Sequence, residues 1–323
     1  MLVVSIDTEE DNWTPTRERL TVENVRELPH LDAVLARLGV RATYFITHEV
    51  ANTPWSAEII GGLAQSGQVE VGAHLHPWNT PPVTSALTAE STMLANLPVE
   101  EQRAKINVLT EVINSRIGSR PTSFRAGRWG FVSSTAQALI DCGYQVDSSV
   151  TPFRSWSGDH GPSHIGAPLD VYRIDPREDH RVASAGGQLV EVPVSWGYSQ
   201  KPWSLVQRLN LVLDSPGVRR LQLARLAARL HLLNHVVLSP EIETVAHMLS
   251  LVRSILARGV RHLHLTFHST SLRAGLSPFS RTETDVDRFY RNLDSVIEKI
   301  AVLTPVRFAT VGEAALLLAS APG

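Results

Sequence analysis

Two histidines and a run of acids are the side chains whose types and spacing could hold a metal ion. His74 and His76 stand two residues apart, so their rings point the same way if a strand runs through both. Two such imidazoles can share one ion at about 2.1 Å each, with a carboxylate completing a three-ligand site open to water. Four acids follow the first apolar run of the chain, at Asp7, Glu9, Glu10 and Asp11. A charged run of this kind is commonly a solvated loop, but its place behind an apolar strand favours a functional role.

Three more polar clusters lie where apolar runs end. Arg125 leads from a short apolar segment into a glycine-containing turn, and Asp147 closes another short segment. His268 follows the alternating segment 262–267. Polar side chains at the ends of successive strands indicate the C-terminal mouth of a β/α barrel, where such folds build their active sites.

The apolar pattern along the chain predicts the elements that would position these residues. Strands are expected at 2–6, 41–46, 69–74, 123–125, 144–148, 189–194, 262–267 and 306–308, alternating with helical patterns. Ser239, Pro240 and Glu241 have the residue types of a helix start, which predicts a helix from there to Gly259. The alternation favours an α/β fold, a barrel of seven to eight strands built mostly from parallel pairs.

Two segments interrupt the alternation of strands and helices. Residues 152–176 are rich in Gly, Pro, Ser and His and are expected to form a long, lid-like loop. Residues 203–233 are rich in Leu and Arg and are expected to form a helical excursion. With no internal repeat, residues 1–323 are interpreted as a single catalytic domain carrying these two insertions.

Composition limits the classes of function. The 323 residues are 43% hydrophobic and 19% charged, with a formal net charge of −2, as in an ordinary globular protein. This balance favours neither nucleic acid nor an anionic membrane surface as a partner, and it does not determine the oligomeric state. No apolar run reaches 18 residues, so no membrane insertion is expected. Because the sequence opens directly on a strand pattern, we expect a cytoplasmic protein.

Taken together and in this order, the five clusters resemble the polysaccharide deacetylases, or NodB-homology family. The matching residues are Asp7 and Glu9 in the first motif, Gly72, His74, His76 and Pro77 in the second, Arg125 in the third, Asp147 in the fourth and His268 in the fifth. The resemblance covers roughly residues 2–150 and 188–312. The Asp-Thr-Glu and His-x-His spacings depart from the family's common Asp-Asp and His-x-x-x-His, so the chain resembles a divergent branch.

The resemblance implies a deformed barrel that hydrolyses an N-acyl amide, most often N-acetyl, on an amino sugar or related carbohydrate. The implied cofactor is a divalent ion, Zn²⁺ or a similar metal, held by Glu9, His74 and His76. Asp7 would then act as the general base and His268 as the general acid. The opposite assignment, with Asp7 as the metal ligand in place of Glu9, stays open.

Supporting and substrate-binding roles follow from the same resemblance. Arg125 would pair with Asp7 or Asp147 and hold that acid ionised. Trp78, Arg128 and Trp129 lie beside the motifs and are candidates for binding the substrate, although ordinary packing explains tryptophans there about as well.

Two other functions compete with a deacetylase. A glycoside hydrolase would also use paired carboxylates at strand ends, without needing three histidines. A carbohydrate-binding pseudoenzyme would keep the barrel and lose the chemistry.

Overall fold

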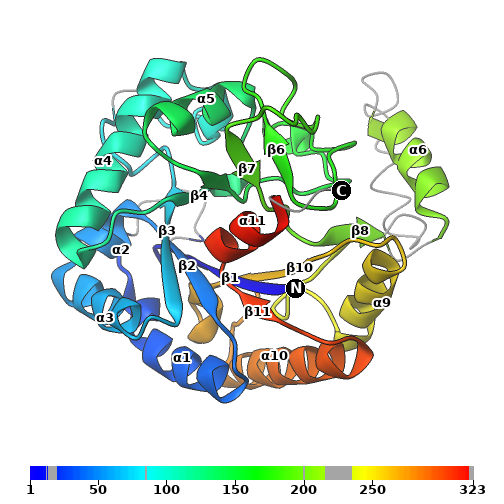
Figure 1. Cartoon of the computed structure of the whole chain (residues 1–323). Helices are drawn as coiled ribbons and strands as arrows, with labels where there is room; N and C mark the ends of the chain where they lie inside the picture. Colours follow the sequence, from blue (N-terminus) through cyan, green and yellow to red (C-terminus); the bar gives the residue numbers. More distant parts are fainter. Residues whose placement is uncertain (12, 14–19, 84–85, 199–200, 215–234, 320–323) are drawn as a thin grey trace.

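Parallel strands form the centre of the molecule (Figure 1). The computed structural model describes residues 1–11, 13, 20–83, 86–198, 201–214 and 235–319. In this part of the chain, one sheet contains β1 (Leu2–Thr8), β2 (Ala42–Ile46), β3 (Val69–Leu75), β4 (Ser123–Ala126), β5 (Val146–Asp147), β6 (Tyr172–Ile174), β7 (Leu189–Glu191), β10 (Leu263–His268) and β11 (Phe308–Ala309). Its order is β10-β1-β2-β3-β4-β5-β7-β6, and β11 pairs with the start of β1. Within this sheet, the pair formed by β6 and β7 is antiparallel and the other pairs are parallel.

The sheet closes on itself without a continuous ladder of strands. A separate antiparallel pair, β8 (Trp196–Tyr198) and β9 (His235–Val237), lies between β7 and β10. The amide of Ser195 donates to the carbonyl of His264 in β10 at 3.3 Å, and the amide of Thr266 donates to the carbonyl of Leu238 at 3.0 Å. Single backbone bonds therefore complete the circuit, and the predicted deformed barrel is confirmed.

Helices surround the outside of this sheet (Figure 1). The helices are α1 (Leu28–Arg37), α2 (His48–Asn52), α3 (Pro54–Gln65), α4 (Val99–Ile117), α5 (Ser133–Asp141), α6 (Trp203–Asp214), α9 (Val245–Leu256), α10 (Glu283–Leu303) and α11 (Val311–Ala319), and all but α11 lie outside the sheet. Their apolar faces bury the outer side of the strands, as Leu2 and Ile6 of β1 show by joining the large core cluster. None of the helices in the described part of the chain combines the length and apolar character needed to cross a membrane.

The helix α11 differs from the others because it lies across the centre of the ring (Figure 1). Its residues Val311, Ala314 and Leu318 form a second apolar cluster with Val3 of β1 and Phe45 of β2. Val3 stands at the start of its strand, so α11 closes the N-terminal end of the barrel. The C-terminal ends of the strands are left for the polar residues. Sequence analysis did not predict this helix.

Most predicted elements are present within a few residues of their expected bounds, but the loop prediction at 152–176 is partly wrong. Residues 172–174 form β6, an edge strand that pairs antiparallel with β7. Three residues are too short for a period-two pattern to be recognised, and β8 and β9 were missed for the same reason. In the predicted excursion 203–233, the helix α6 is confirmed and residues 215–233 lie outside the described residues.

The predicted helix start at Ser239 is wrong. The helix α9 begins at Val245, where the Thr244 hydroxyl accepts a hydrogen bond from the His247 amide at 3.3 Å. Ile242, which lies inside the predicted helix, is 49% exposed. The cause is a tertiary contact. The Glu241 carboxylate is bonded to His268 in β10 and to Ser271 shortly after it, and these bonds hold residues 239–242 in a turn.

The packing of α10 yields a stability prediction. Replacing Leu293, fully buried in the main core, by Ala should lower the free energy of unfolding by about 2–5 kcal/mol, since it removes apolar contacts and leaves a cavity. The matched control is Leu303→Ala in the same helix, where the side chain is 39% exposed, and its cost should stay within about 0.5 kcal/mol. Urea unfolding of both variants measures the difference, and equal losses would contradict this account of the core.

Candidate functional site

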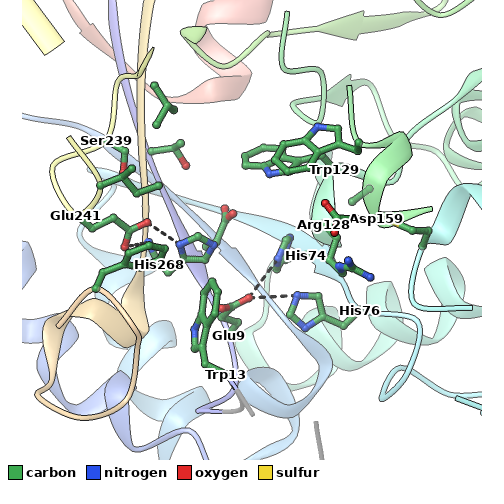
Figure 2. A pocket seen from close by; sticks show the side chains of 18 of the residues that line it. Glu9, Trp13, His74, His76, Arg128, Trp129, Asp159, Ser239, Glu241 and His268 are labelled. Atoms are coloured by element: carbon green, nitrogen blue, oxygen red, sulfur yellow. Dashed lines mark hydrogen bonds and ion pairs between the residues drawn. The ribbon is translucent and has the colours of Figure 1, made fainter. Parts of the chain in front are cut away.

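Side chains from the C-terminal ends of the strands line a cavity of about 540 Å³ (Figure 2). Asp7 and Glu9 reach it from β1, and His268 reaches it from β10. The chain has seven tryptophans, and five line this cavity: Trp13, Trp78, Trp129, Trp156 and Trp196. The pocket thus combines a few acids and histidines with aromatic walls, the usual makeup of a small-molecule site.

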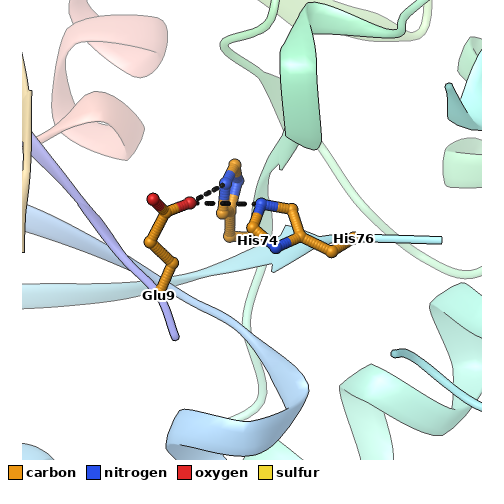
Figure 3. Close-up of side chains that lie close together, drawn as sticks. All are labelled: Glu9, His74 and His76. Carbon is orange, nitrogen blue, oxygen red and sulfur yellow. Dashed lines mark ion pairs between the residues drawn. The ribbon is translucent and has the colours of Figure 1, made fainter. Parts of the chain in front are cut away.

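Glu9, His74 and His76 form a cluster that could hold a metal ion (Figure 3). One Glu9 oxygen, Oε2, lies 3.2 Å from His76 Nε2 and 3.8 Å from His74 Nε2. A tetrahedral ion with bonds of about 2.1 Å separates its ligand atoms by about 3.4 Å, so these atoms fit around one ion. The predicted ligand set therefore meets in space, and it is the only such group of three in the described part of the chain.

The far ring nitrogens of both histidines are held by protein acceptors. His74 Nδ1 bonds the carbonyl oxygen of Arg125 at 3.0 Å, and His76 Nδ1 bonds Glu10 Oε2 at 3.0 Å. With a metal ion bound, a proton on each Nδ1 would leave each Nε2 lone pair free to bind that ion, which is how metal-binding histidines are commonly oriented. Glu10 has no predicted role of its own, because nothing in the acidic run of the sequence distinguishes a metal ligand from a residue that bonds a ligand.

Close packing fixes the His76 ring. Trp78 stacks on it with ring centroids 4.2 Å apart. A Cβ atom at Gly127 would lie 2.3 Å from His76 Cδ2, so only glycine leaves room for the ring there. The loop after His76 is held from below by the buried Lys105, whose ammonium donates to the carbonyl oxygens of residues 77, 80 and 82 at 2.6–3.0 Å.

Asp7 lies in the same pocket but is bound to an arginine rather than to the histidines. Asp7 Oδ1 accepts a hydrogen bond from Arg125 Nη1 at 2.5 Å, and the Arg125 side chain is fully buried. Burial alone would raise the pKa of Asp7, but the Arg125 guanidinium and the nearby histidines outweigh it and lower the pKa. Asp7 is therefore a carboxylate with a fixed orientation. Of the two acids predicted as partners of Arg125, Asp7 and Asp147, the structure pairs Arg125 with Asp7.

Glu9 is also ionised at neutral pH. Burial favours its neutral form, but His268, His74 and His76 together lower the pKa of Glu9 below its ordinary value. A carboxylate ligand must be deprotonated to bind a cation, so this electrostatic environment suits a metal ligand.

His268 faces the pocket and is paired with Glu241 (Figure 2). His268 Nδ1 lies 2.7 Å from Glu241 Oε1, and the other oxygen of Glu241 accepts from the Ser271 hydroxyl at 2.6 Å. Burial lowers the pKa of His268, but Glu241 and Glu9 raise it to about 10, so the ring carries a proton at neutral pH. Glu241 was missed as a site residue because its Ser-Pro-Glu context predicts a helix start.

Asp147, one of the residues predicted to be catalytic, is not among the side chains that line the pocket. Its carboxylate accepts hydrogen bonds from the amide and hydroxyl of Ser149 at 2.9 and 2.8 Å. The Ser149 hydroxyl in turn accepts from the amide of Ala126, the residue after Arg125, at 2.8 Å. Burial raises the pKa of Asp147, and burial beside Asp147 raises the pKa of Glu191. Asp147 is a positioning residue for the strand that carries Arg125.

The predicted substrate-binding residues all line the pocket. Arg128 and Trp129 both have left-handed backbone angles, with φ of 55° and 60°, which turn their side chains toward the cavity. Arg128 Nη1 bonds the Thr92 hydroxyl, and Trp129 packs against Trp156 with ring centroids 6.4 Å apart. Trp78 has a second contact, its stack on His76, so it supports a histidine as well as lining the cavity.

Comparison with known proteins relates this site to one family. Residues 20–146 match the family model for polysaccharide deacetylase, a range that includes His74, His76 and Arg125. The motif resemblance predicted from the sequence is therefore confirmed over that range. The residues of the first and fifth motifs, Asp7, Glu9 and His268, lie outside it. None of the curated proteins compared with the sequence matches it significantly.

Solved structures share the fold over nearly the whole chain. A Mycobacterium smegmatis protein provisionally assigned as a polysaccharide deacetylase aligns with 98% of this chain and 89% of its own, at 17% identity and a TM-score of 0.56. A Parabacteroides distasonis protein provisionally assigned as a glycoside hydrolase/deacetylase aligns with 98% of this chain and 70% of its own, at 13% identity and a TM-score of 0.60. At these identities the likeness concerns the fold.

The geometry of the three-residue cluster predicts a metal-binding phenotype. His74→Ala should abolish stoichiometric binding of a divalent metal, because it removes one of three ligands of the only such cluster in the described residues. His247→Ala is the control, since His247 is an exposed histidine on α9. Elemental analysis of both purified variants measures bound metal per chain, and a fully loaded His74→Ala protein would show that the site is wrong.

The His268–Glu241 pair predicts a pKa change. Glu241→Gln removes the negative charge that stabilises the imidazolium ion, so the pKa of His268 should fall from about 10 by about 1–3 units. An NMR titration of the His268 ring measures this shift. Glu243→Gln, which alters a carboxylate bonded to the exposed His247, should leave the His268 titration where it is. An unchanged pKa in Glu241→Gln would refute the pairing.

Proposed function

We propose, from the match of residues 20–146 to the polysaccharide deacetylase family and from the geometry of the pocket, that this protein is a metal-dependent hydrolase. Its reaction is the removal of an N-acyl group, N-acetyl above all, from an amino sugar or related carbohydrate. The observation that carries the proposal is the meeting of a Glu9–His74–His76 cluster with Asp7 and His268 in one cavity.

Zn²⁺ is the proposed cofactor, because two imidazole nitrogens and one carboxylate oxygen are a common catalytic ligand set for this ion. When bound, such an ion polarises the amide carbonyl and lowers the pKa of a water molecule toward about 7. Glu9, His74 and His76 would hold it, and the bonds of both histidines to protein acceptors keep their ligand nitrogens in place.

Asp7 is the proposed general base. It lines the cavity beside the metal cluster, and Arg125 keeps it ionised and limits its rotation. An ionised carboxylate in that position would accept a proton from the water that attacks the amide carbon. The pairing with Arg125 also favours Glu9 over Asp7 as the metal ligand, since one Asp7 oxygen already faces the guanidinium.

His268 is the proposed general acid. Its pKa of about 10 keeps the ring protonated at neutral pH, and Glu241 fixes which nitrogen points away from the cavity. The ring would donate its proton to the amide nitrogen as the carbon–nitrogen bond breaks, so that the amine leaves in neutral form. Base and acid then return to their starting states by exchanging protons with water.

A glycoside hydrolase is less well supported by this pocket. Such an enzyme needs one carboxylic acid with a raised pKa to protonate the leaving oxygen. Asp7 and Glu9 instead both have lowered pKa values. Of the two other carboxylates that line the pocket, Glu241 is bonded to His268 and Ser271, and Asp159 lies beside Arg128. The charges of the pocket therefore suit amide hydrolysis better than glycoside cleavage.

The two acids of the first motif can be separated by mutation. Asp7→Asn should retain bound metal and lose at least about 100-fold in the rate of acetate release, because a general base contributes about 10²–10⁴-fold. Glu9→Gln should lose the metal as well as the activity. Asp294→Asn, which changes a partly exposed aspartate of α10 that is paired with Arg37, serves as the control.

The measurements are metal content and acetate release from a panel of N-acetyl amino sugars, with reducing-sugar release followed in parallel. Loss of metal in Asp7→Asn with retention in Glu9→Gln would reverse the two assignments. Reducing sugar formed without acetate, and insensitive to a chelator, would favour the glycosidase.

A further inference from the structure

The loops around the pocket are joined to one another, and the first junction lies between the loops after β3 and β5. The Asn96 side chain donates to the carbonyl oxygen of His160 at 2.9 Å. Next to this bond, Met93 packs on Gly161, where an added Cβ would lie 3.0 Å from the Met93 Cε. These contacts place a wall along this side of the cavity.

The wall continues from the loop after β5 to the β8–β9 pair. Trp156 meets Trp196 edge to face, with ring centroids 5.9 Å apart. Behind these rings, the Arg154 guanidinium lies 4.7 Å from the centre of the Trp156 ring and bonds His235 Nδ1 at 3.1 Å. Arg154 does not line the cavity, so it supports the tryptophans from outside and makes the wall rigid.

The loops on the remaining sides of the pocket are also joined by side-chain contacts. Glu241, after β9, is bonded to His268 and to the residues that follow β10. The Trp13 indole, after β1, donates to Thr270 Oγ1 at 2.9 Å and packs on Phe279 with ring centroids 5.5 Å apart. Between β1 and β3 the two loops are joined beneath the cavity, where the fully buried Glu10 accepts hydrogen bonds from His76 and Asn79.

From this ring of contacts we infer that the pocket takes a single small N-acyl amino sugar or the terminal unit of a short oligosaccharide, and excludes the interior units of a long polysaccharide. An interior sugar unit is linked to the rest of the polysaccharide on two sides, so both polysaccharide segments would have to leave the pocket through the same opening. A terminal sugar unit is linked on one side, so one segment leaves the pocket. The cavity of about 540 Å³ is in the range of small-molecule pockets, about 300–1,000 Å³.

The chemistry of the walls matches one sugar ring held above the metal cluster. Trp129 faces the cavity across from His74 and His76, and Arg128 and Asp159 lie together at one side (Figure 2). An aromatic surface suits the apolar face of a sugar, and a neighbouring guanidinium and carboxylate suit its hydroxyl groups. This inference rests on the proposed function for its reaction and on the closed rim for its size limit.

The test compares N-acetylglucosamine oligomers of increasing length, from the disaccharide to the soluble polymer, as substrates of the metal-loaded protein. We expect the initial rate of acetate release per molecule to stay constant with length, so that the rate per acetyl group falls in inverse proportion to length. Acetate release that grows in proportion to the number of units would overturn the inference, while it would support the proposed deacetylase function.

Opening the rim supplies a second variant. Met93→Ala combined with Asn96→Ala removes the junction between the loops after β3 and β5, and should raise the polymer-to-disaccharide rate ratio severalfold. Asn114→Ala, at an exposed position of α4, should leave the ratio unchanged. An unchanged ratio in the double variant, with the fold intact by circular dichroism, would count against the closed rim as the cause of selectivity.

Binding to the His74→Ala variant separates the inference from catalysis. We expect the N-acetylglucosamine disaccharide to change the fluorescence of the pocket tryptophans, and end-blocked polymer of the same linkage to leave it unchanged. If the wild type releases no acetate while this difference holds, the proposed reaction fails and the size limit stands. If neither ligand binds the variant and neither is a substrate of the wild type, the inferred substrate class is wrong.

Discussion

The buried ion pair between Asp7 and Arg125 is the interaction on which the rest of the site depends. Its two charges lie inside the barrel, where an unpaired charge would cost about 3–5 kcal/mol, so each residue requires the other. Arg125 also donates to Thr266 in β10 and to the carbonyl and hydroxyl of Ser148, after β5. One guanidinium therefore fixes the spacing of four strand ends. The carbonyl oxygen of Arg125 in addition accepts a hydrogen bond from His74, which links the acid to the Glu9–His74–His76 cluster.

The period of two along each strand explains how the barrel interior divides into layers. In β1, Val3 packs against the helix that closes the N-terminal end, Ser5 bonds His264 in the middle, and Asp7 reaches the pocket. The residues between them face the surrounding helices and form the main core. A single strand thereby contributes a residue to the apolar cluster beneath α11, a residue to the hydrogen bonds in the middle of the barrel and a residue to the pocket. A slip of one residue in its register would exchange all three with the core.

Some residues of the site could be predicted from the sequence and others could not. His74 and His76 were predictable as a pair because strand geometry alone places alternate side chains on one face. Gly72, the glycine of the second motif, allows two strands to pack closely, since a Cβ there would lie 2.6 Å from the Phe45 ring. Glu241 was not predictable, because its contact with His268 joins residues 27 positions apart and local signals favoured a helix start. The tertiary contacts are worth more than a capping preference of about 1 kcal/mol.

The type of fold, the residue types of the proposed metal ligands and the order of the motifs could be predicted from the sequence, because each depends on spacing along one strand or on one short segment. The tertiary structure alone decided which acid faces the histidines and which faces Arg125. Asp7 and Glu9 are two residues apart and chemically alike, so only the positions of Arg125 and His76 around them distinguish their roles. The closed rim is likewise tertiary, since each of its junctions joins two loops that are distant in the chain.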